Sequence, residues 1–377
     1  MIDGVVVTGD VLRPDGGGRP GGTDRATRWL WNAVKRPVFL ATGLAAEMLT
    51  PTASPALSQW IDSLRTPADA DAHWARVNAC LPWSAARDEL ILERLRRRFC
   101  IGYEMPPWLV RLLDEHAVPY VDVRLHPVRF LDDLIFAVRG SCAETQAGLL
   151  TMAMLESEVI VTAGLREAMC QFISEARVPE NTLLVAGQRR FDSTQIVAGG
   201  FFEAEPLAPE IHAICARYET VLLKPHPLDR HHSLLEVAAG APTRVLGVID
   251  DNIYRMMAMP QISAVLTVNS GVAHEAPYFG KRVHTLLPLP MRPAWGETAL
   301  RGPAAEAGVH ASLDDIVLTP DFWRTLLAGY TNVSPLDGMR LKPKPNRLRI
   351  SLDSFWNYQQ IDTDRIPRAV NHDVGNN

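Results

Sequence analysis

The sequence predicts an α/β protein made of two units, each a parallel sheet with helices on both faces. Short apolar runs alternate with segments of helical periodicity, which is typical of strand–helix–strand units. The chain of 377 residues is also longer than one hydrophobic core usually supports. A new strand–helix series begins near residue 180, so we expect domains at residues 1–179 and 180–335, followed by a linker, a helix and a loose tail at residues 336–377.

The composition narrows the class of protein. Hydrophobic residues make up 47% of the chain and charged residues 21%, as in globular proteins. The formal net charge of −5 argues against a general nucleic-acid binder. The five cysteines are widely spaced without a C-x-x-C pair, which favours free thiols in a reducing compartment over disulfides or a zinc site. Because no signal peptide or long apolar run is seen, we expect a cytoplasmic protein.

The first unit is expected to place an acidic side chain at the edge of its sheet. Glu104 follows an apolar strand and precedes a helix that begins with proline. Arg129 lies in the polar segment that follows the next strand. We expect strands at residues 5–7, 37–44, 99–102 and 119–123, and helices at residues 23–35, 54–64, 84–98, 108–116, 145–155 and 165–176.

The second unit repeats the strand–helix alternation. Its first predicted strand, residues 181–185, is followed by a polar loop that contains Gln188 and Asp192. Asn252 begins a short helix, where it either caps the helix or faces a ligand, and the sequence favours capping. We expect strands at residues 181–185, 221–223, 244–248, 264–268 and 282–287, and helices at residues 209–218, 233–238, 252–259, 271–279 and 323–330.

Two strand ends in the second unit carry groups that suit an anion. In the run VLLKPHP, a buried strand ends in Lys224 and His226, and each is followed by a proline that stiffens the backbone. In AVLTVNSGVAHEA, a strand runs into Ser270 and Gly271 at a helix start, where free N–H groups favour a phosphate. Because open α/β sheets bind ligands at the carboxyl ends of their strands, these residues predict an anion-binding cleft.

On the residues alone, simpler roles stay open for each of these side chains. Ser270 fits an ordinary helix cap and Glu275 a solvated helix residue, while His226 fits a histidine satisfied by nearby backbone. Asp192 fits a turn residue, and Glu104 fits a charge near a helix N-terminus.

The chain resembles retaining β-Kdo glycosyltransferases in several segments taken together. The resemblance is nearest to the WbbB-type O-antigen module, with the capsule-linker β-Kdo transferases a step further away, and it touches roughly residues 1–290. It implies the GT-B fold, in which two Rossmann-like domains face each other across a deep interdomain cleft. The segments that carry it are IGYEMPP (101–107), HPVRFLDDL (126–134), GQRRFDS (187–193), LLKPHP (222–227) and VNSGVAHEA (268–276).

The resemblance implies a role for two carboxylates. Asp192 would attack the ketose carbon of CMP-β-Kdo and form a covalent adduct, and Glu104 would deprotonate the acceptor hydroxyl, so that two inversions give retention. No metal or other cofactor is expected. The residues implied to bind the donor are Gln188, Lys224, His226, Ser270, Gly271 and Glu275, with Arg129 and Asn252 as further possibilities.

The expected function is transfer of Kdo to an acceptor sugar of a bacterial surface polysaccharide, either lipopolysaccharide O-antigen or capsule. The expected partners are CMP-Kdo, a glycan acceptor on a lipid carrier, and other polysaccharide-assembly enzymes, with no nucleic acid. The basic segment at residues 339–350 is a linker or a peripheral contact with the inner membrane, and a linker is favoured. Two alternatives stay open: a CDP-polyol phosphotransferase of the teichoic type, and a catalytically silent module that binds nucleotide sugars.

Overall fold

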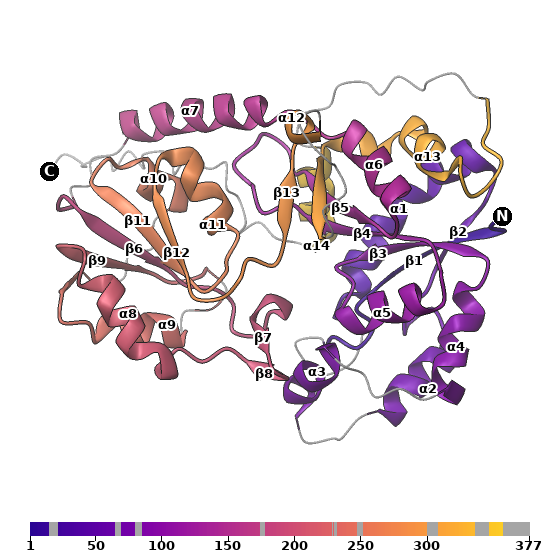
Figure 1. Cartoon of the computed structure of the whole chain (residues 1–377), viewed down its shortest axis with the longest axis horizontal. Helices are drawn as coiled ribbons and strands as arrows, with labels where there is room; N and C mark the ends of the chain where they lie inside the picture. The colour runs from indigo at the N-terminus through magenta and orange to yellow at the C-terminus, as the bar shows by residue number, and fades with distance from the viewer. Residues whose placement is uncertain are drawn as a thin grey trace, which may run out of the picture.

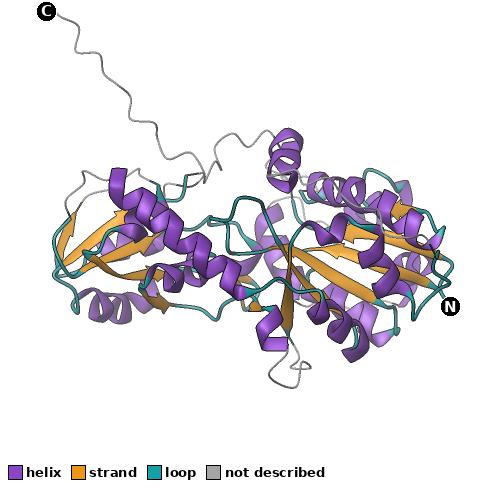
Figure 2. Cartoon of the chain, turned by 90° about the horizontal axis from the view of Figure 1, so that it is seen from above, coloured by secondary structure: helices purple, strands orange, loops and turns teal. Residues whose placement is uncertain are grey.

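The computed structural model describes residues 1–14, 22–64, 69–79, 85–173, 178–227, 229, 232–246, 252–299, 308–335 and 347–356. Its longer strands form two sheets that follow one another along the long axis of the molecule, and helices flank each sheet (Figures 1 and 2). A small antiparallel ribbon, β7 (Ile196–Val197) and β8 (Gly200–Phe201), lies between the two units (Figure 1).

The first sheet has seven strands in the order β13-β14-β5-β4-β3-β1-β2. β2, β1, β3 and β4 are parallel, as predicted, but β5 runs antiparallel to both of its neighbours, β4 and β14. The strands are β1 (Gly4–Gly9), β2 (Ala46–Met48), β3 (Arg98–Tyr103), β4 (Tyr120–Leu125), β5 (Phe136–Gly140), β13 (Arg292–Ala294) and β14 (Val309–Leu313).

The second sheet is entirely parallel, with five strands in the order β10-β9-β6-β11-β12. This order agrees with the strand–helix alternation that the sequence predicts for the second unit. The strands are β6 (Thr182–Ala186), β9 (Thr220–Lys224), β10 (Arg244–Leu246), β11 (Ile262–Thr267) and β12 (Arg282–Thr285).

Helices cover both faces of each sheet and form four apolar cores with them. One face of the first sheet carries α1 (Asp24–Thr42), α6 (Ala143–Thr151), α13 (Pro320–Leu327) and α14 (Arg347–Trp356), and the other carries α2 (Pro55–Ser63), α3 (Ala70–Ala79), α4 (Ala85–Leu95) and α5 (Pro107–Glu115). One face of the second sheet carries α7 (Glu156–Ile173), α10 (Ile253–Ala258), α11 (Val272–Glu275) and η3 (Ala276–Phe279), and the other carries α8 (Ala208–Cys215) and α9 (Ser233–Ala239). The remaining short elements are η1 (Ser193–Gln195), η2 (Glu205–Leu207), α12 (Gly296–Ala299) and η4 (Asp315–Leu318).

The central strands are apolar on both faces because each face meets a layer of helices. In β1, Val5 and Val7 join one core and Val6 joins the opposite one. In β6, Leu183 and Leu184 divide between the two cores of the second sheet in the same way. This alternation follows from the two-residue period of a strand, and the segments after the strand ends carry polar residues with which the chain can build a site.

The predicted strand at residues 37–44 is wrong, because α1 continues through this segment. Val34, Val38 and Ala41 recur at helical spacing and bury the inner face of α1 in the core. The burial of these side chains offsets the one helical hydrogen bond that Pro37 removes.

The predicted domain boundaries are also wrong. α7 precedes residue 180 but packs on the second sheet, against α10 and η3. β13 and β14 precede residue 335 but extend the first sheet. Within the expected tail, α14 places Leu348 and Leu352 in the first-sheet core, while residues 336–346 and 357–377 lie outside the described part of the chain.

The chain crosses between the two units twice, and the two crossings are bonded to each other. The N–H of Gly296, on the returning segment, donates to the carbonyl of Met154 on the departing one at 2.9 Å. The carboxylate of Glu297 accepts hydrogen bonds from the N–H groups of Glu156 (2.8 Å) and Ser157 (3.2 Å) at the start of α7. The first turn of α7 is thus capped by a side chain from the other crossing.

Candidate active site

A cavity of about 650 Å³ lies between the strand ends of the first sheet and those of the second. Its walls include the segments that follow β3 and β4 on one side and β6, β9 and β11 on the other. All the residues that the sequence predicts for the site line this cavity: Glu104, Arg129, Gln188, Asp192, Lys224, His226, Asn252, Ser270, Gly271 and Glu275.

Glu104 is held in an unusual backbone conformation at the end of β3. Its φ of +47° is in the left-handed region, which costs energy for a residue with a side chain. Neighbouring bonds maintain the turn: the N–H of Glu104 donates to Val123 at 3.0 Å, and the N–H of Met105 donates to the buried carboxylate of Asp122 at 2.9 Å. Arg124 then bridges Asp122 (2.9 Å) and the carbonyl of Met105 (3.0 Å).

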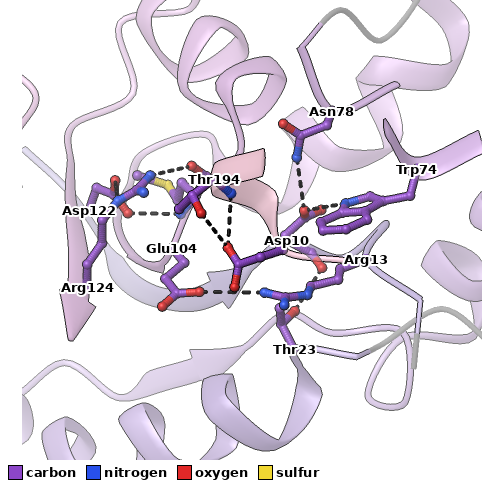
Figure 3. A network of polar contacts seen from close by, with 11 residues as sticks. Asp10, Arg13, Thr23, Trp74, Asn78, Glu104, Asp122, Arg124 and Thr194 are labelled. Atoms are coloured by element: carbon purple, nitrogen blue, oxygen red, sulfur yellow. Dashed lines mark hydrogen bonds and ion pairs between the residues drawn. The ribbon is translucent and has the colours of Figure 1, made fainter. Parts of the chain in front are cut away.

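The carboxylate of Glu104 lies near the side chain of Arg13, which is not among the predicted site residues. An Arg13 guanidinium nitrogen lies 3.7 Å from Glu104 Oε2, and the two groups are joined in Figure 3. Burial raises the pKa of Glu104, Arg13 acts against that rise, and the negative charge of Asp192 adds to it. Arg13 follows the buried strand β1, just as Lys224 and His226 follow a buried strand in the second unit, so its sequence position was a usable signal.

Asp192 occupies a short capped loop after β6. Its Oδ1 accepts hydrogen bonds from both the N–H and the hydroxyl of Thr194, each at 3.0 Å, and so caps η1. Within the described part of the chain, Oδ2 of Asp192 accepts no hydrogen bond. One oxygen is therefore fixed by the loop while the other is available on a wall of the cavity.

Gln188 ties the Asp192 loop to the loop after β11. Its amide donates to Thr194 Oγ1 at 2.9 Å and to Asn269 Oδ1 at 3.0 Å, and the amide of Asn269 donates to the Thr194 carbonyl at 2.7 Å. The side chain of Gln188 is buried and its donors are engaged in these bonds. The geometry therefore suits support of the loop, whereas the sequence predicts contact with the donor.

Lys224 and His226 follow β9 at the cavity wall, as expected for a strand end. The Lys224 carbonyl accepts the N–H of Gly187 at 2.8 Å, which joins this loop to the β6 loop. Burial, together with the positive charges of Arg189 and Lys224, lowers the pKa of His226 to about 4. At neutral pH the imidazole of the free protein is therefore neutral and offers one N–H donor.

Ser270 and Gly271 precede a short helix rather than the continuous one predicted for residues 271–279. α11 has four residues and passes directly into η3. Gly271 lies close to the first unit, since a Cβ added there would be 3.3 Å from the Pro127 carbonyl oxygen. Its lack of a side chain thus permits close approach of the two cavity walls.

Glu275 is buried and connects the two units, so the alternative of a solvated helix residue is wrong. Its Oε1 accepts hydrogen bonds from the N–H of Arg129 at 2.7 Å and the hydroxyl of Tyr254 at 2.9 Å. Burial raises the pKa of Glu275 to about 7, although these bonds oppose the rise. Asn252 caps α10, as the sequence favours, by accepting the N–H of Tyr254 at 2.8 Å.

The basic segment expected at residues 339–350 is only partly described. Arg349 is buried and donates to the carbonyls of Arg129 and Leu131, each at 2.9 Å. Arg347 pairs with Asp315 at 3.1 Å. Arg349 is therefore engaged inside the protein and does not face lipid headgroups.

The described residues contain no cluster of three or more side chains suited to a metal ion. No single described helix has the length and apolar character of a membrane span, although the bent pair Ala143–Thr151 and Glu156–Gln171 meets that test jointly. In chemical terms the cavity combines two carboxylates from opposite walls with several basic side chains, an arrangement that can bind an anionic molecule and act on it by nucleophilic or general-base chemistry.

No protein-family model matches the chain, and no curated protein matches it. Among solved structures, the chain is similar to Thermosulfurimonas dismutans KpsC, a beta Kdo 2,7 transferase, with 15% identity and a TM-score of 0.32 over 66% of this chain and 81% of that one. At this identity and TM-score the likeness carries no particular activity to this chain, and no comparison points to the O-antigen type of enzyme.

Proposed function

We propose that this chain is a retaining glycosyltransferase of the GT-B type that moves Kdo from CMP-β-Kdo to an acceptor sugar of a bacterial surface polysaccharide. The observation that carries the proposal is the shared cavity of Asp192 and Glu104, two carboxylates supplied by opposite sheets. Similar segments around both residues occur in β-Kdo transferases, which supports the choice of Kdo as the transferred sugar.

In the proposed first step, Asp192 attacks the ketose carbon of Kdo. A bond forms between a carboxylate oxygen and that carbon, the bond to the phosphate oxygen breaks, and CMP leaves with the electron pair. Thr194 bonds Oδ1 of Asp192, so we propose that Oδ2 forms the new bond. The carboxylate on the ketose carbon of Kdo disfavours an oxocarbenium ion, which supports a covalent route.

In the second step, the acceptor hydroxyl attacks the same carbon and releases Asp192. Glu104 takes the hydroxyl proton as general base, and the second inversion restores the configuration of the donor. This role needs ionised Glu104, which is why the cations around its carboxylate matter.

Basic and neutral donors around the cavity suit the charges of CMP-Kdo. Lys224 and the backbone at Ser270 and Gly271 are proposed to bind the phosphate, with neutral His226 as an N–H donor. Arg129 is proposed to bind the sugar carboxylate. We place this activity in the cytoplasm, on an acceptor carried by a lipid at the inner membrane.

The decisive experiment is intact-protein mass spectrometry after brief exposure to CMP-Kdo without acceptor. We expect the wild type to gain one Kdo and release CMP, and Asp192→Asn to gain nothing. Asp3→Asn, on an exposed pair with Arg97, is the matched control and should behave as wild type. Equal behaviour of wild type and Asp192→Asn would refute the nucleophile. Turnover of CDP-glycerol but not CMP-Kdo would favour a polyol phosphotransferase, and CMP binding without turnover would favour a silent module.

A further inference from the structure

A buried polar cluster lies next to Glu104, in the loop after β1. Asp10 is 3% exposed, and its carboxylate accepts hydrogen bonds from the indole N–H of Trp74 (2.8 Å), the amide of Asn78 (3.4 Å) and the N–H of Leu12 (3.2 Å). These bonds join the β1 loop to α3 and fix the plane of the Trp74 ring. Figure 3 shows Asp10, Trp74 and Asn78 beside Arg13.

Arg13 rests on this cluster. The centre of its guanidinium lies 5.2 Å from the centroid of the Trp74 ring, which is within the range of a cation–π contact. Its other side meets the Glu104 carboxylate at 3.7 Å. Burial disfavours the charge of Arg13, but the carboxylates of Asp192, Glu104 and Asp10, in that order of strength, outweigh burial and raise its pKa.

The same tryptophan also contacts the chain that follows Asp192. Trp74 packs on Phe201 of β8, with ring centroids 5.8 Å apart, and Phe201 meets Phe191 edge to face at 5.1 Å. Phe191 directly precedes Asp192. A row of three rings therefore connects the support of Arg13 with the loop of Asp192, although these residues belong to different units.

We propose that Arg13 is a positioning residue that holds Glu104 and Asp192 in register across the cavity, with Trp74 as its support. The proposal rests on the proposed function, because it assigns those two carboxylates to one reaction. The positive charge of the guanidinium is favoured by both carboxylates, which would otherwise repel each other, and its rigid fork presents N–H donors in fixed directions. Neither Arg13 nor Trp74 lies in a segment that resembles Kdo transferases.

Arg13 also sets the pH range in which Glu104 can act as a base. The charged and titratable groups that act on Glu104 are Arg13, Arg124 and Arg129, which favour ionisation, and Asp192, which opposes it, together with the adjacent Tyr103 hydroxyl. Arg13 is the strongest of the three cations. Its loss should raise the pKa of Glu104, so that the base becomes ionised only at higher pH.

The test compares wild type with Arg13→Gln, Arg13→Lys and Trp74→Phe by two measurements. The first is NMR titration of isotope-labelled glutamate carboxyls, with the Glu104 signal assigned by its loss in Glu104→Gln; this measurement needs no substrate. The second is the pH profile of Kdo transfer. Arg96→Gln, which removes an exposed pair with Glu89, is the matched control, and melting curves show whether each variant is folded.

We expect Arg13→Gln to raise the pKa of Glu104, to move the acidic limb of the pH profile to higher pH, and to lower kcat by roughly 10²-fold through misplacement of the reacting groups. Arg13→Lys should keep the titration of Glu104 near that of wild type but lose rate, because a lysine retains the charge without the fork. Trp74→Phe should raise the pKa of Glu104 and lower kcat by less than Arg13→Gln does. If Arg13→Lys is folded and both Arg13 variants titrate and react as wild type does, the proposal is wrong. If Arg13→Gln shifts the titration while the wild type does not use CMP-Kdo, Arg13 keeps its positioning role and the proposed function fails instead.

Discussion

The two walls of the cavity hold their carboxylates in different ways. On the first wall, Glu104 has a left-handed backbone and lies beside Arg13. Its surroundings shift the pKa of its carboxyl. On the second wall, Asp192 has an extended backbone, and one of its oxygens is fixed by Thr194 while the other is not. The difference teaches that a general base needs a tuned pKa, whereas a nucleophile needs a fixed direction of approach.

The largest effect should come from removing the base while keeping the nucleophile. We expect Glu104→Gln to lose between about 10² and 10⁴ in the rate of transfer to acceptor, which is the usual contribution of a general base. The same variant should still form the Kdo adduct, because the proposed first step uses Asp192. Time-resolved intact-protein mass spectrometry in the presence of acceptor should show an adduct that persists longer than in wild type.

Formation of the Kdo adduct tests, in a single experiment, whether the carboxylates of the two walls have separate roles. If Glu104→Gln fails to form it, the two carboxylates do not have separate roles, and the contrast between them disappears. The exposed residue Glu158 provides the control, since Glu158→Gln lies on the outer side of α7 and should leave both steps unchanged.

A smaller effect is expected from Gln188→Ala, which loosens the second wall without removing its carboxylate. Thr194 and Asn269 each lose a buried hydrogen-bond partner, so the free energy of unfolding should fall by about 1–3 kcal/mol. If Gln188 supports the Asp192 loop, kcat should fall while KM for the donor changes little. A rise in KM with kcat intact would instead assign Gln188 to donor binding. Gln59→Ala, at an exposed position on α2, is the control.

The smallest effect on the reaction is expected at Glu275, the contact that joins the walls, where the change is one of stability. Its pKa of about 7 is above the ordinary value of 4.5 for a free glutamate, so the folded protein prefers the protonated form. The cost of ionising Glu275 in the folded state is therefore fully present above pH 7 and vanishes as the pH falls below 4.5. Glu275→Gln should stabilise the protein by at most about 3 kcal/mol at pH 8 and by almost nothing at pH 4.

Denaturant unfolding of both proteins at several pH values measures this difference directly. Glutamine keeps an acceptor oxygen for the N–H of Arg129 and the hydroxyl of Tyr254, so packing should be preserved. A loss of stability at pH 8 would mean that the ionised carboxylate strengthens the contact between the units.

The site residues were accessible from the sequence because they follow a simple rule. Buried strands such as residues 221–223 are recognisable as apolar runs, and the polar residues after them must emerge at one edge of a parallel sheet. Lys224, His226 and Ser270 follow this rule, whereas Asp192 is predicted from the resemblance to Kdo transferases, and all four line one cavity. Arg13 also follows a buried strand, β1, but it is not among the predicted site residues, because none of the segments that resemble Kdo transferases includes it.

The domain boundaries were not accessible in the same way. β13 has three residues and contains a proline, so its sequence carries little strand pattern. Its place in the first sheet depends on pairing with β14, and that of β14 on pairing with β5, which is distant in the chain. The ionisation of His226 also depends on burial and on Arg189, neither of which a local pattern contains.

The bonded crossings between Met154 and Gly296 make residues 156–291 an insert with both ends at one point. Because its entry and exit are bonded to each other, the inserted body leaves and rejoins the first unit at one place, and the contacts at Glu275 hold it against the first unit at a second place. An insert joined in this way interrupts the chain of the first unit but not the strand order of its sheet, which stays continuous from β13 to β2.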